Sequence, residues 1–185
     1  MVLKFNPPPD WPEPPSGWEP PPGWSPDPSW PPMPDGWRLW VDHVDPQPIS
    51  GGPDELITLD NLTVEHLYGV LSNAYMNVFI DEGDLGVREG CVFWVMPSPE
   101  YRRVKLVAYY GFTETSTEME RLACANQINY EYIMVQAAVM GDRLRFSYDI
   151  PLDAPMTRRL FASIVKRFSQ IPPEAVGEFG KEIID

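Results

Sequence analysis

The sequence has few of the residues on which most catalytic and nucleic-acid-binding sites depend. Among 185 residues there are two His, two Cys, and 14 Lys and Arg against 27 Asp and Glu, which gives a formal net charge of −13. Binding to a nucleic-acid backbone needs clustered basic side chains, so we expect no nucleic-acid partner. There is no long apolar run and no apolar signal segment at the start, so we expect a cytoplasmic protein without a membrane span.

Common catalytic motifs are also missing from the sequence. It has no G-x-S-x-G elbow, no Walker A loop and no G-x-G-x-x-G segment. The acidic turn Asp81–Asp84 lacks the alternating ligands of a calcium loop. Cys91 and Cys124 lack the paired spacing of a zinc site and are expected as small apolar core residues, with a disulfide as the alternative. We therefore expect no enzyme, no catalytic residue, no metal and no cofactor.

Proline and tryptophan dominate the first 53 residues. Only six of the 23 prolines lie after residue 53, and five tryptophans recur at steps of six or seven residues: Trp11, Trp18, Trp24, Trp30 and Trp37. Proline removes backbone donors and biases the preceding residue away from the helical region, which excludes helix. The pattern predicts an irregular, polyproline-like arm and linker over residues 1–53, with a short strand-like run from Trp37 to Asp42, followed by a domain over residues 54–185.

Large apolar rings are rare in disordered segments, so something is expected to cover the arm tryptophans. Three alternatives remain open: docking on the chain's own domain or a dimer mate, capture by a partner with an aromatic-lined groove, or no attachment. Segments of this kind resemble the leaders in front of small globular domains in many actinobacterial proteins.

The domain shows alternating helix and strand patterns. Thr117 and Glu120 form a capping box, and the helix that they begin carries Met119, Leu122, Ala123 and Asn126 on one face. Thr63 caps the first helix, and Pro172-Pro173 is expected to end the third. The expected elements are helices over 63–75, 117–129 and 155–171, and strands over 76–80, 87–96, 102–113, 132–139 and 143–150. This α-β-β-β-α-β-β-α order indicates an α+β fold with an antiparallel sheet.

Several stretches resemble the YbjN family of proposed bacterial sensory-transduction regulators. They are VFWVM, LACANQIN, VQAAVMGDRLRFSYDIPLD and RRLFASIVKRF, and the best single marker is Asn126 in the second helix. The resemblance covers about two thirds of the chain and leaves out the arm. It implies a type III secretion chaperone-like fold and a non-catalytic domain that binds protein and forms a homodimer, without implying any substrate.

The domain holds more aromatic residues around its third strand than one face of a small sheet must bury. They are Tyr101, Tyr109, Tyr110, Phe112, Tyr130 and Tyr132. Either they pack in the core and between strands, or some of them line a groove that receives Trp/Pro units.

The function that these observations favour is protein binding, by a chaperone-like or regulatory adaptor with an unidentified protein partner. Two alternatives stay open. One is an enzyme that uses the acidic turn Asp81–Asp84 together with His66, and the other is a scaffold whose Trp/Pro arm does the recognising.

Overall fold

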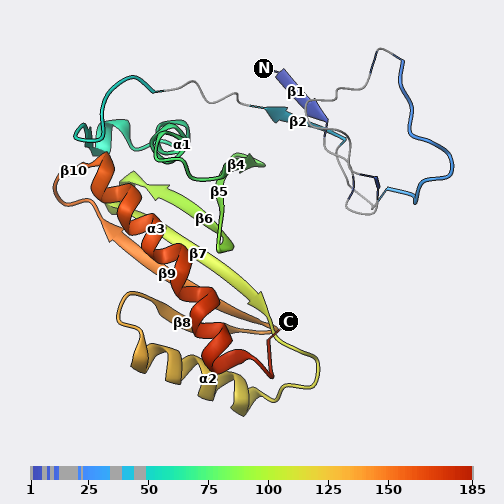
Figure 1. The fold of residues 1–185 in the computed structure, drawn as a ribbon, viewed down its shortest axis with the longest axis vertical. Coiled ribbons are helices and arrows are strands. Elements are labelled where there is room, and N and C mark those ends of the chain that lie inside the picture. Colours follow the sequence, from blue (N-terminus) through green and yellow to red (C-terminus); the bar gives the residue numbers. More distant parts are fainter. Residues whose placement is uncertain are drawn as a thin grey trace. The chain divides into compact units, whose positions relative to one another are not determined.

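The computed structural model describes residues 2–5, 8, 11, 12, 21, 23–33, 39–43 and 49–184 (Figure 1). The chain divides into two compact units, Met1–Asp45 and Pro46–Asp185, which are treated separately. Residues 49–53, expected in the linker, fall within the second unit and bond to its helices. The Asn73 amide donates to the Ile49 carbonyl at 3.2 Å, and the Arg159 backbone N–H donates to the Pro53 carbonyl at 2.9 Å.

The N-terminal unit contains a pair of short strands. Strand β1 (Val2–Phe5) pairs antiparallel with β2 (Trp40–His43), so that Phe5 lies opposite Trp40. The sequence pattern indicated a strand near β2 but none at β1. The pairing joins segments separated by most of the arm, and such long-range partners leave no local signal in a sequence.

The C-terminal unit is built on a six-stranded antiparallel sheet with the strand order β4-β5-β6-β7-β9-β8. Its strands are β4 (Val78–Asp81), β5 (Asp84–Glu89), β6 (Cys91–Ser98), β7 (Arg103–Gly111), β8 (Gln136–Met140) and β9 (Arg143–Pro151). The longer helices are α1 (Val64–Asn73), α2 (Glu118–Glu131) and α3 (Arg158–Ala175). The expected α+β class with an antiparallel sheet is confirmed.

Short elements complete this unit. Strand β3 (Leu56–Ile57) pairs with β10 (Met156–Thr157). Single-turn helical segments lie at η1 (Leu59–Asn61), η2 (Pro99–Tyr101) and η3 (Val176–Gly180). Among the described residues, no helix is long and apolar enough to cross a membrane.

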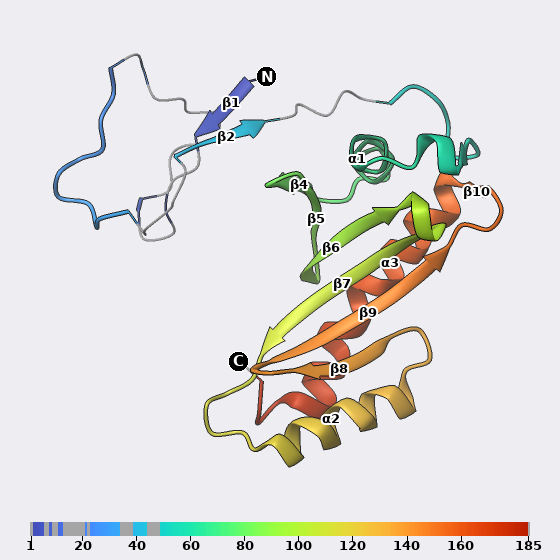
Figure 2. The ribbon, with the colours of Figure 1, turned by 180° about the vertical axis from the view of Figure 1, so that it is seen from behind.

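Helix α3 covers one face of the sheet. Phe161, Val165 and Phe168 recur at helical spacing and are fully buried, and the Phe168 ring meets Phe93 of β6 edge to face at 5.2 Å. Figure 1 shows α3 in front of β6, β7 and β9, and Figure 2 shows the same strands from behind, facing the viewer. The hydrophobic core therefore lies between α3 and one side of the sheet, with α1 and α2 extending it at the two ends.

Two helix starts were predicted correctly, whereas both ends of α3 were misplaced. Thr63 and Thr117 cap α1 and α2 as expected, accepting hydrogen bonds from the N–H groups of His66 and Glu120. Helix α3 is capped by Thr157 and not near Pro155, because β10 keeps the preceding residues extended.

The third helix also continues through Pro172 and Pro173 to Ala175. A proline at position 173 leaves the Ser169 carbonyl without its helical donor. The Cys91 thiol lies 3.8 Å from this oxygen as a weak donor, so a contact with the sheet replaces the missing hydrogen bond.

The expected strand over residues 87–96 is two strands. The chain turns at Gly90, which has φ +70°, so that Glu89 of β5 pairs with Cys91 of β6. A Cβ at Gly90 would lie 2.7 Å from the Ser169 carbonyl oxygen, which means that the tight turn and the close approach of α3 both require glycine. The turn was not predicted because strand-forming residues lie on both sides of it, Val87 before and Cys91 to Val95 after.

Asn129 of α2 closes the β8 edge of the sheet. Its side-chain amide donates to the Ala137 carbonyl at 2.9 Å, and its oxygen accepts from the Ala137 N–H at 2.7 Å. The side chain thus bonds to the backbone N–H and carbonyl of Ala137 as a further strand would, and caps these groups at the edge of the sheet. Asn126, the residue marked by the family resemblance, is exposed, and its side chain makes no hydrogen bond within residues 49–184.

Replacing Asn129 with alanine should lower the free energy of unfolding by about 1–2 kcal/mol, because two hydrogen bonds to a strand are lost. Asn126→Ala is the matched control, since it makes the same change at an exposed position of the same helix. Urea unfolding followed by circular dichroism would measure both. Equal effects of the two substitutions would contradict the structural role of Asn129.

Candidate functional site

The arm tryptophans that the structure describes gather in an aromatic cluster within the N-terminal unit. Trp11 is 6% exposed, its ring lies 5.1 Å from that of Trp30, and its indole N–H donates to the Pro31 carbonyl at 2.7 Å. The Trp24 ring contacts Trp30 at 6.2 Å and Phe5 at 5.0 Å. Within this unit the rings cover one another, an arrangement that is not among the three alternatives left open by the sequence. Trp18 and Trp37 lie outside the described residues.

A repeated turn places these rings. The N–H groups of Trp11, Trp24 and Trp30 each donate at 3.0 Å to the carbonyl three residues earlier. In the sequence a proline lies two residues before each of these tryptophans, and proline favours the second position of such turns because its φ is already set. The signal for the cluster was therefore present in the sequence as an x-Pro-x-Trp spacing, but only the folded arm shows that the rings meet.

The six aromatic residues of the expected groove do not lie together. Tyr110 and Phe112 belong to the core, where the Tyr110 ring meets Phe146 at 5.6 Å. Tyr130 and Tyr132 lie at the C-terminal end of α2. Tyr101 and Tyr109 are 67% and 44% exposed, at the start and near the end of β7. A groove for Trp/Pro units on these residues stays a prediction, and Tyr109 belongs to the surface described next.

The face of the sheet opposite α3 presents alternate residues of its strands, and we call it the open face. One row across the strands is Gly86, Trp94, Val107, Ser147 and Gln136. Neighbouring positions on the same side add Phe79, Arg88, Val92, Met96, Arg103, Lys105, Tyr109, Ala138, Arg143, Arg145 and Asp149. Figure 2 shows this side of β6, β7 and β9 without a helix over it in residues 49–184.

Apolar groups form the middle of the open face. Val92, Met96 and Tyr109 are 51%, 43% and 44% exposed, whereas the rings of Phe79 and Trp94 are partly covered and Val107, opposite Trp94, is buried. The Phe79 ring lies over Gly86, where a Cβ would come within 2.6 Å of it, and meets Trp94 edge to face at 5.6 Å. The result is an exposed apolar area on a preformed, rigid sheet.

Basic groups surround this apolar area although the chain as a whole is strongly acidic. The Arg88 guanidinium stacks over the Phe79 ring at 4.4 Å. Arg103 pairs with Asp149 at 3.3 Å. Within residues 49–184 no ion pair forms at the remaining cations, which are Arg88, Lys105, Arg143 and Arg145. The open face therefore carries uncompensated positive charge, with Asp81 and Asp84 at the tip of the β4–β5 hairpin as its outlying acids.

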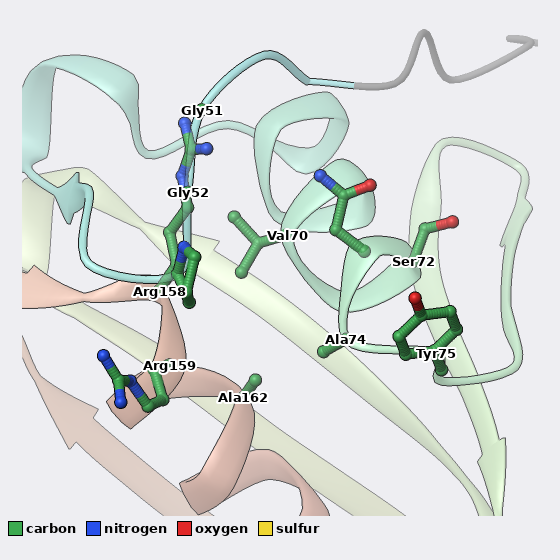
Figure 3. A pocket seen from close by; sticks show the side chains of 11 residues that line it. Gly51, Gly52, Val70, Ser72, Ala74, Tyr75, Arg158, Arg159 and Ala162 are labelled. Atoms are coloured by element: carbon green, nitrogen blue, oxygen red, sulfur yellow. The ribbon is translucent and has the colours of Figure 1, made fainter.

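A pocket of about 550 Å³ lies between the C-terminal end of α1, the loop at residues 51–53 and the start of α3. Figure 3 shows Arg158, Arg159 and Tyr75 around it. Arg158 pairs with Glu55 at 2.8 Å and donates to the Ser50 carbonyl at 2.9 Å, and Arg159 pairs with Asp54. Both arginines are thus paired with acids of the same domain, and we call this region, where the end of α1, residues 51–55 and the start of α3 meet, the joint.

His66, the candidate base of the enzyme alternative, belongs to the surroundings of this joint. Burial of the imidazole is the main cause that lowers its pKa, Arg158 lowers it further, and Glu55 opposes them. The side-chain Nε2 is buried and has no hydrogen-bond partner among the described residues. The charges that act on His66 are thus those of the joint and not the carboxylates of Asp81–Asp84. In the described part of the chain no group of three or more His, Cys, Asp or Glu is placed to hold a metal.

Both cysteines are free thiols in the structure. Cys124 is buried in the core and Cys91 is half-buried against it. Burial raises the pKa of each thiol, which disfavours the reactive thiolate. The expectation of two core cysteines, and not a disulfide, is confirmed.

The Trp11→Phe substitution should loosen the aromatic cluster, because it removes the hydrogen bond to Pro31. With 5-fluorotryptophan incorporated, 19F NMR of the full chain should lose one resonance and show shifts in two others, those of Trp24 and Trp30. Trp94→Phe, a change in the other unit, is the control and should leave those two resonances in place. Unchanged Trp24 and Trp30 resonances in the Trp11 variant would contradict the cluster.

Stability should fall on acidification partly through His66. The pKa of His66 is lower in the folded state than its unfolded value near 6.5. As the pH falls below 6.5 the unfolded chain takes up a proton more readily than the folded chain, so the free energy of unfolding decreases. His66→Gln should remove this part of the loss. Urea midpoints of both proteins at about pH 7.5 and pH 5.5 measure the effect. A wild type that loses no more stability than the variant would refute the assignment.

Comparison with known proteins supports the fold. No protein-family model and no curated protein matches the chain. Among solved structures it is similar to the crystal structure of YbjN from E. coli, a proposed transcription regulator, with a TM-score of 0.52 and 16% identity over 67% of this chain and 98% of that chain. At this identity the likeness shows a YbjN-like fold and leaves the function open. It gives no support to the likeness between the arm and actinobacterial leaders.

Proposed function

We propose that this protein binds other proteins through the open face, as a chaperone-like or regulatory adaptor without catalytic chemistry. The observation that carries the proposal is a six-stranded sheet that α3 covers on one side only, while the other side presents exposed apolar groups within a basic rim. Contiguous exposed apolar surface with polar surroundings is typical of protein interaction sites. The YbjN-like fold and its proposed regulatory relative agree with this reading.

The residue types of the open face suit an interface. Aromatic side chains and arginine are enriched at protein interfaces and supply most of the residues whose loss costs binding energy. Trp94, Tyr109 and Arg145 lie in neighbouring rows of the sheet, and the backbone hydrogen bonds of β6, β7 and β9 hold them in place. A partner would therefore meet a surface that needs little ordering on binding.

The charge of the open face specifies the partner's chemistry. Unpaired cations around an apolar centre fit an amphipathic segment whose apolar side is bordered by acidic residues. A neutral or basic segment would leave these cations without partners. We infer an acidic amphipathic segment as the preferred ligand.

The two alternatives find less support in the molecule. The enzyme alternative needs His66 to act with Asp81–Asp84, but its charged neighbours are Arg158 and Glu55. The scaffold alternative needs arm tryptophans that are free to bind, but Trp11 is buried and Trp24 and Trp30 are half-buried in the cluster.

The double variant Tyr109→Ser/Arg145→Glu should reduce capture of protein partners at least tenfold. It removes an apolar group and reverses a charge at two positions that face each other on β7 and β9. Native affinity purification with the full chain as bait, followed by quantitative mass spectrometry, would measure the recovered partners.

Tyr75→Ser/Lys166→Glu is the matched control. It makes the same chemical changes at exposed residues that lie outside the open face, one after α1 and one on α3. Equal recovery of partners by wild type, open-face variant and control would exclude the open face as the binding surface. Urea unfolding of all three proteins would show that any loss of binding does not come from unfolding.

A further inference from the structure

Helix α2 has a second apolar side that faces away from the core, and we call it the α2 stripe. Its members lie on one side of the helix, three or four residues before or after one another, with Leu122 and Ala123 adjacent in sequence: Met119, Leu122, Ala123, Asn126 and Tyr130. Met119, Leu122 and Tyr130 are 81%, 47% and 80% exposed. The opposite side of the helix packs in the core through Cys124, Ala125 and Ile128. The apolar stripe continues past the helix end to Ile133, which is 95% exposed.

The α2 stripe is bordered by negative charge. Glu118, Glu120 and Glu131 are each adjacent in sequence to a stripe residue, so they lie about 100° around the helix from it. Within residues 49–184 none of the three forms an ion pair. Arg121 does not offset them, because its guanidinium is turned to the other side and donates to Ser116 Oγ at 2.8 Å and to the Gly141 carbonyl at 3.1 Å.

The domain thus carries two unpartnered apolar surfaces of opposite charge, and this restricts how two copies can associate. A contact between two α2 stripes would bring the glutamates of both copies together. A contact between two open faces would bring their arginines together. Only the contact of one stripe with one open face joins an acidic border to a basic one.

We propose that the α2 stripe of one copy binds the open face of a second copy. This inference rests on the proposed function, because it uses the open face as a protein-binding surface and identifies the chain itself as one of its ligands. The stripe supplies the acidic amphipathic helix that the face requires, with Met119 and Tyr130 as its most exposed apolar groups. In the complex the sheet gains a helix on the side opposite α3, and its exposed apolar groups Val92, Met96 and Tyr109 are removed from water.

The dimensions of the two surfaces agree. From Met119 to Tyr130 the stripe is about 16 Å long at 1.5 Å per residue. The four strands β6, β7, β9 and β8 span about 14 Å at a spacing of 4.8 Å. One helix can therefore lie across the centre of the open face and bring its glutamates close to Arg88 on one side and Arg145 within the sheet.

Reversing the charges of the two surfaces tests the proposal in the full-length protein. The helix variant is Glu118→Lys/Glu131→Lys, which leaves the capping residue Glu120 unchanged. The face variant is Arg88→Glu/Arg145→Glu. In sedimentation velocity from about 1 to 100 µM, a range that covers typical weak self-association, wild type should self-associate, and added salt should weaken the association. Each variant alone should raise the dissociation constant at least tenfold.

Complementation should then restore association. Mixing the helix variant with the face variant places lysines opposite glutamates, and the protein with all four substitutions should associate with itself again. Arg88→Glu/Arg143→Glu repeats the face reversal at two exposed positions, in case the half-buried Arg145 does not tolerate glutamate. Lys166→Glu/Arg167→Glu on α3 is the control and should associate like wild type.

Three results would overturn the proposal. A face variant that associates like wild type would point to a stripe–stripe contact, and a helix variant that does so would point to a face–face contact. A wild type that stays monomeric throughout would exclude self-association through either surface. Partner capture in the affinity experiment would survive this last result, which distinguishes failure of the inference from failure of the proposed function.

Discussion

One-sided coverage of the sheet by α3 is the constraint on which the rest of this domain depends. The stripe of Phe161, Val165 and Phe168 seals the core side of the central strands. Successive side chains along a strand point to opposite faces of the sheet, so each core side chain is followed by one on the other face. In residues 49–184 the long amphipathic helix α3 covers one of the two faces of the sheet. The other face is therefore available to contact another molecule.

The charges of the domain separate in space although they are mixed in sequence. The β-strand period places Arg88, Lys105 and Arg145 on the side opposite α3, whereas the acids Glu118, Glu120 and Glu131 line α2. A net charge of −13 suggests only solubility and general repulsion between copies. The local charges can nevertheless favour contact between two copies. At physiological salt the Debye length is about 8 Å, so charges farther away have little effect on two surfaces in contact.

The N-terminal unit is held together mainly by aromatic side chains. Its proline content prevents helix and supplies little backbone pairing, so aromatic contacts among Phe5, Trp11, Trp24 and Trp30 hold it together, with one strand pair. A segment whose composition favours disorder becomes ordered where repeated turns bring large rings into contact. Trp11, Trp24 and Trp30 each end the same kind of hydrogen-bonded turn.

Local interactions in this chain could be predicted from the sequence. The caps at Thr63 and Thr117, the antiparallel pairing of β8 with β9 and the apolar stripe of α3 each depend on residues close together along the chain. Elements that depend on distant neighbours could not be predicted in this way. The turn at Gly90 depends on the close approach of α3, and the passage of α3 through Pro173 depends on the contact of Cys91 with the freed carbonyl. Asn129, and not Asn126, is the important amide because the start of β8 lies beside it.

The candidate site shows the same division. The sequence by itself determined which residues share a side of each strand and helix, including Met119, Leu122, Ala123 and Asn126 on α2, since the periods of 2 and 3.6 are properties of the backbone. Only the tertiary structure decided which side faces the core. Both sides of α2 are apolar enough to be buried. The side with the small residues Cys124 and Ala125 faces the core, because the helix must come close to β8 for Asn129 to bond to Ala137. The larger residues of the stripe were thereby left exposed.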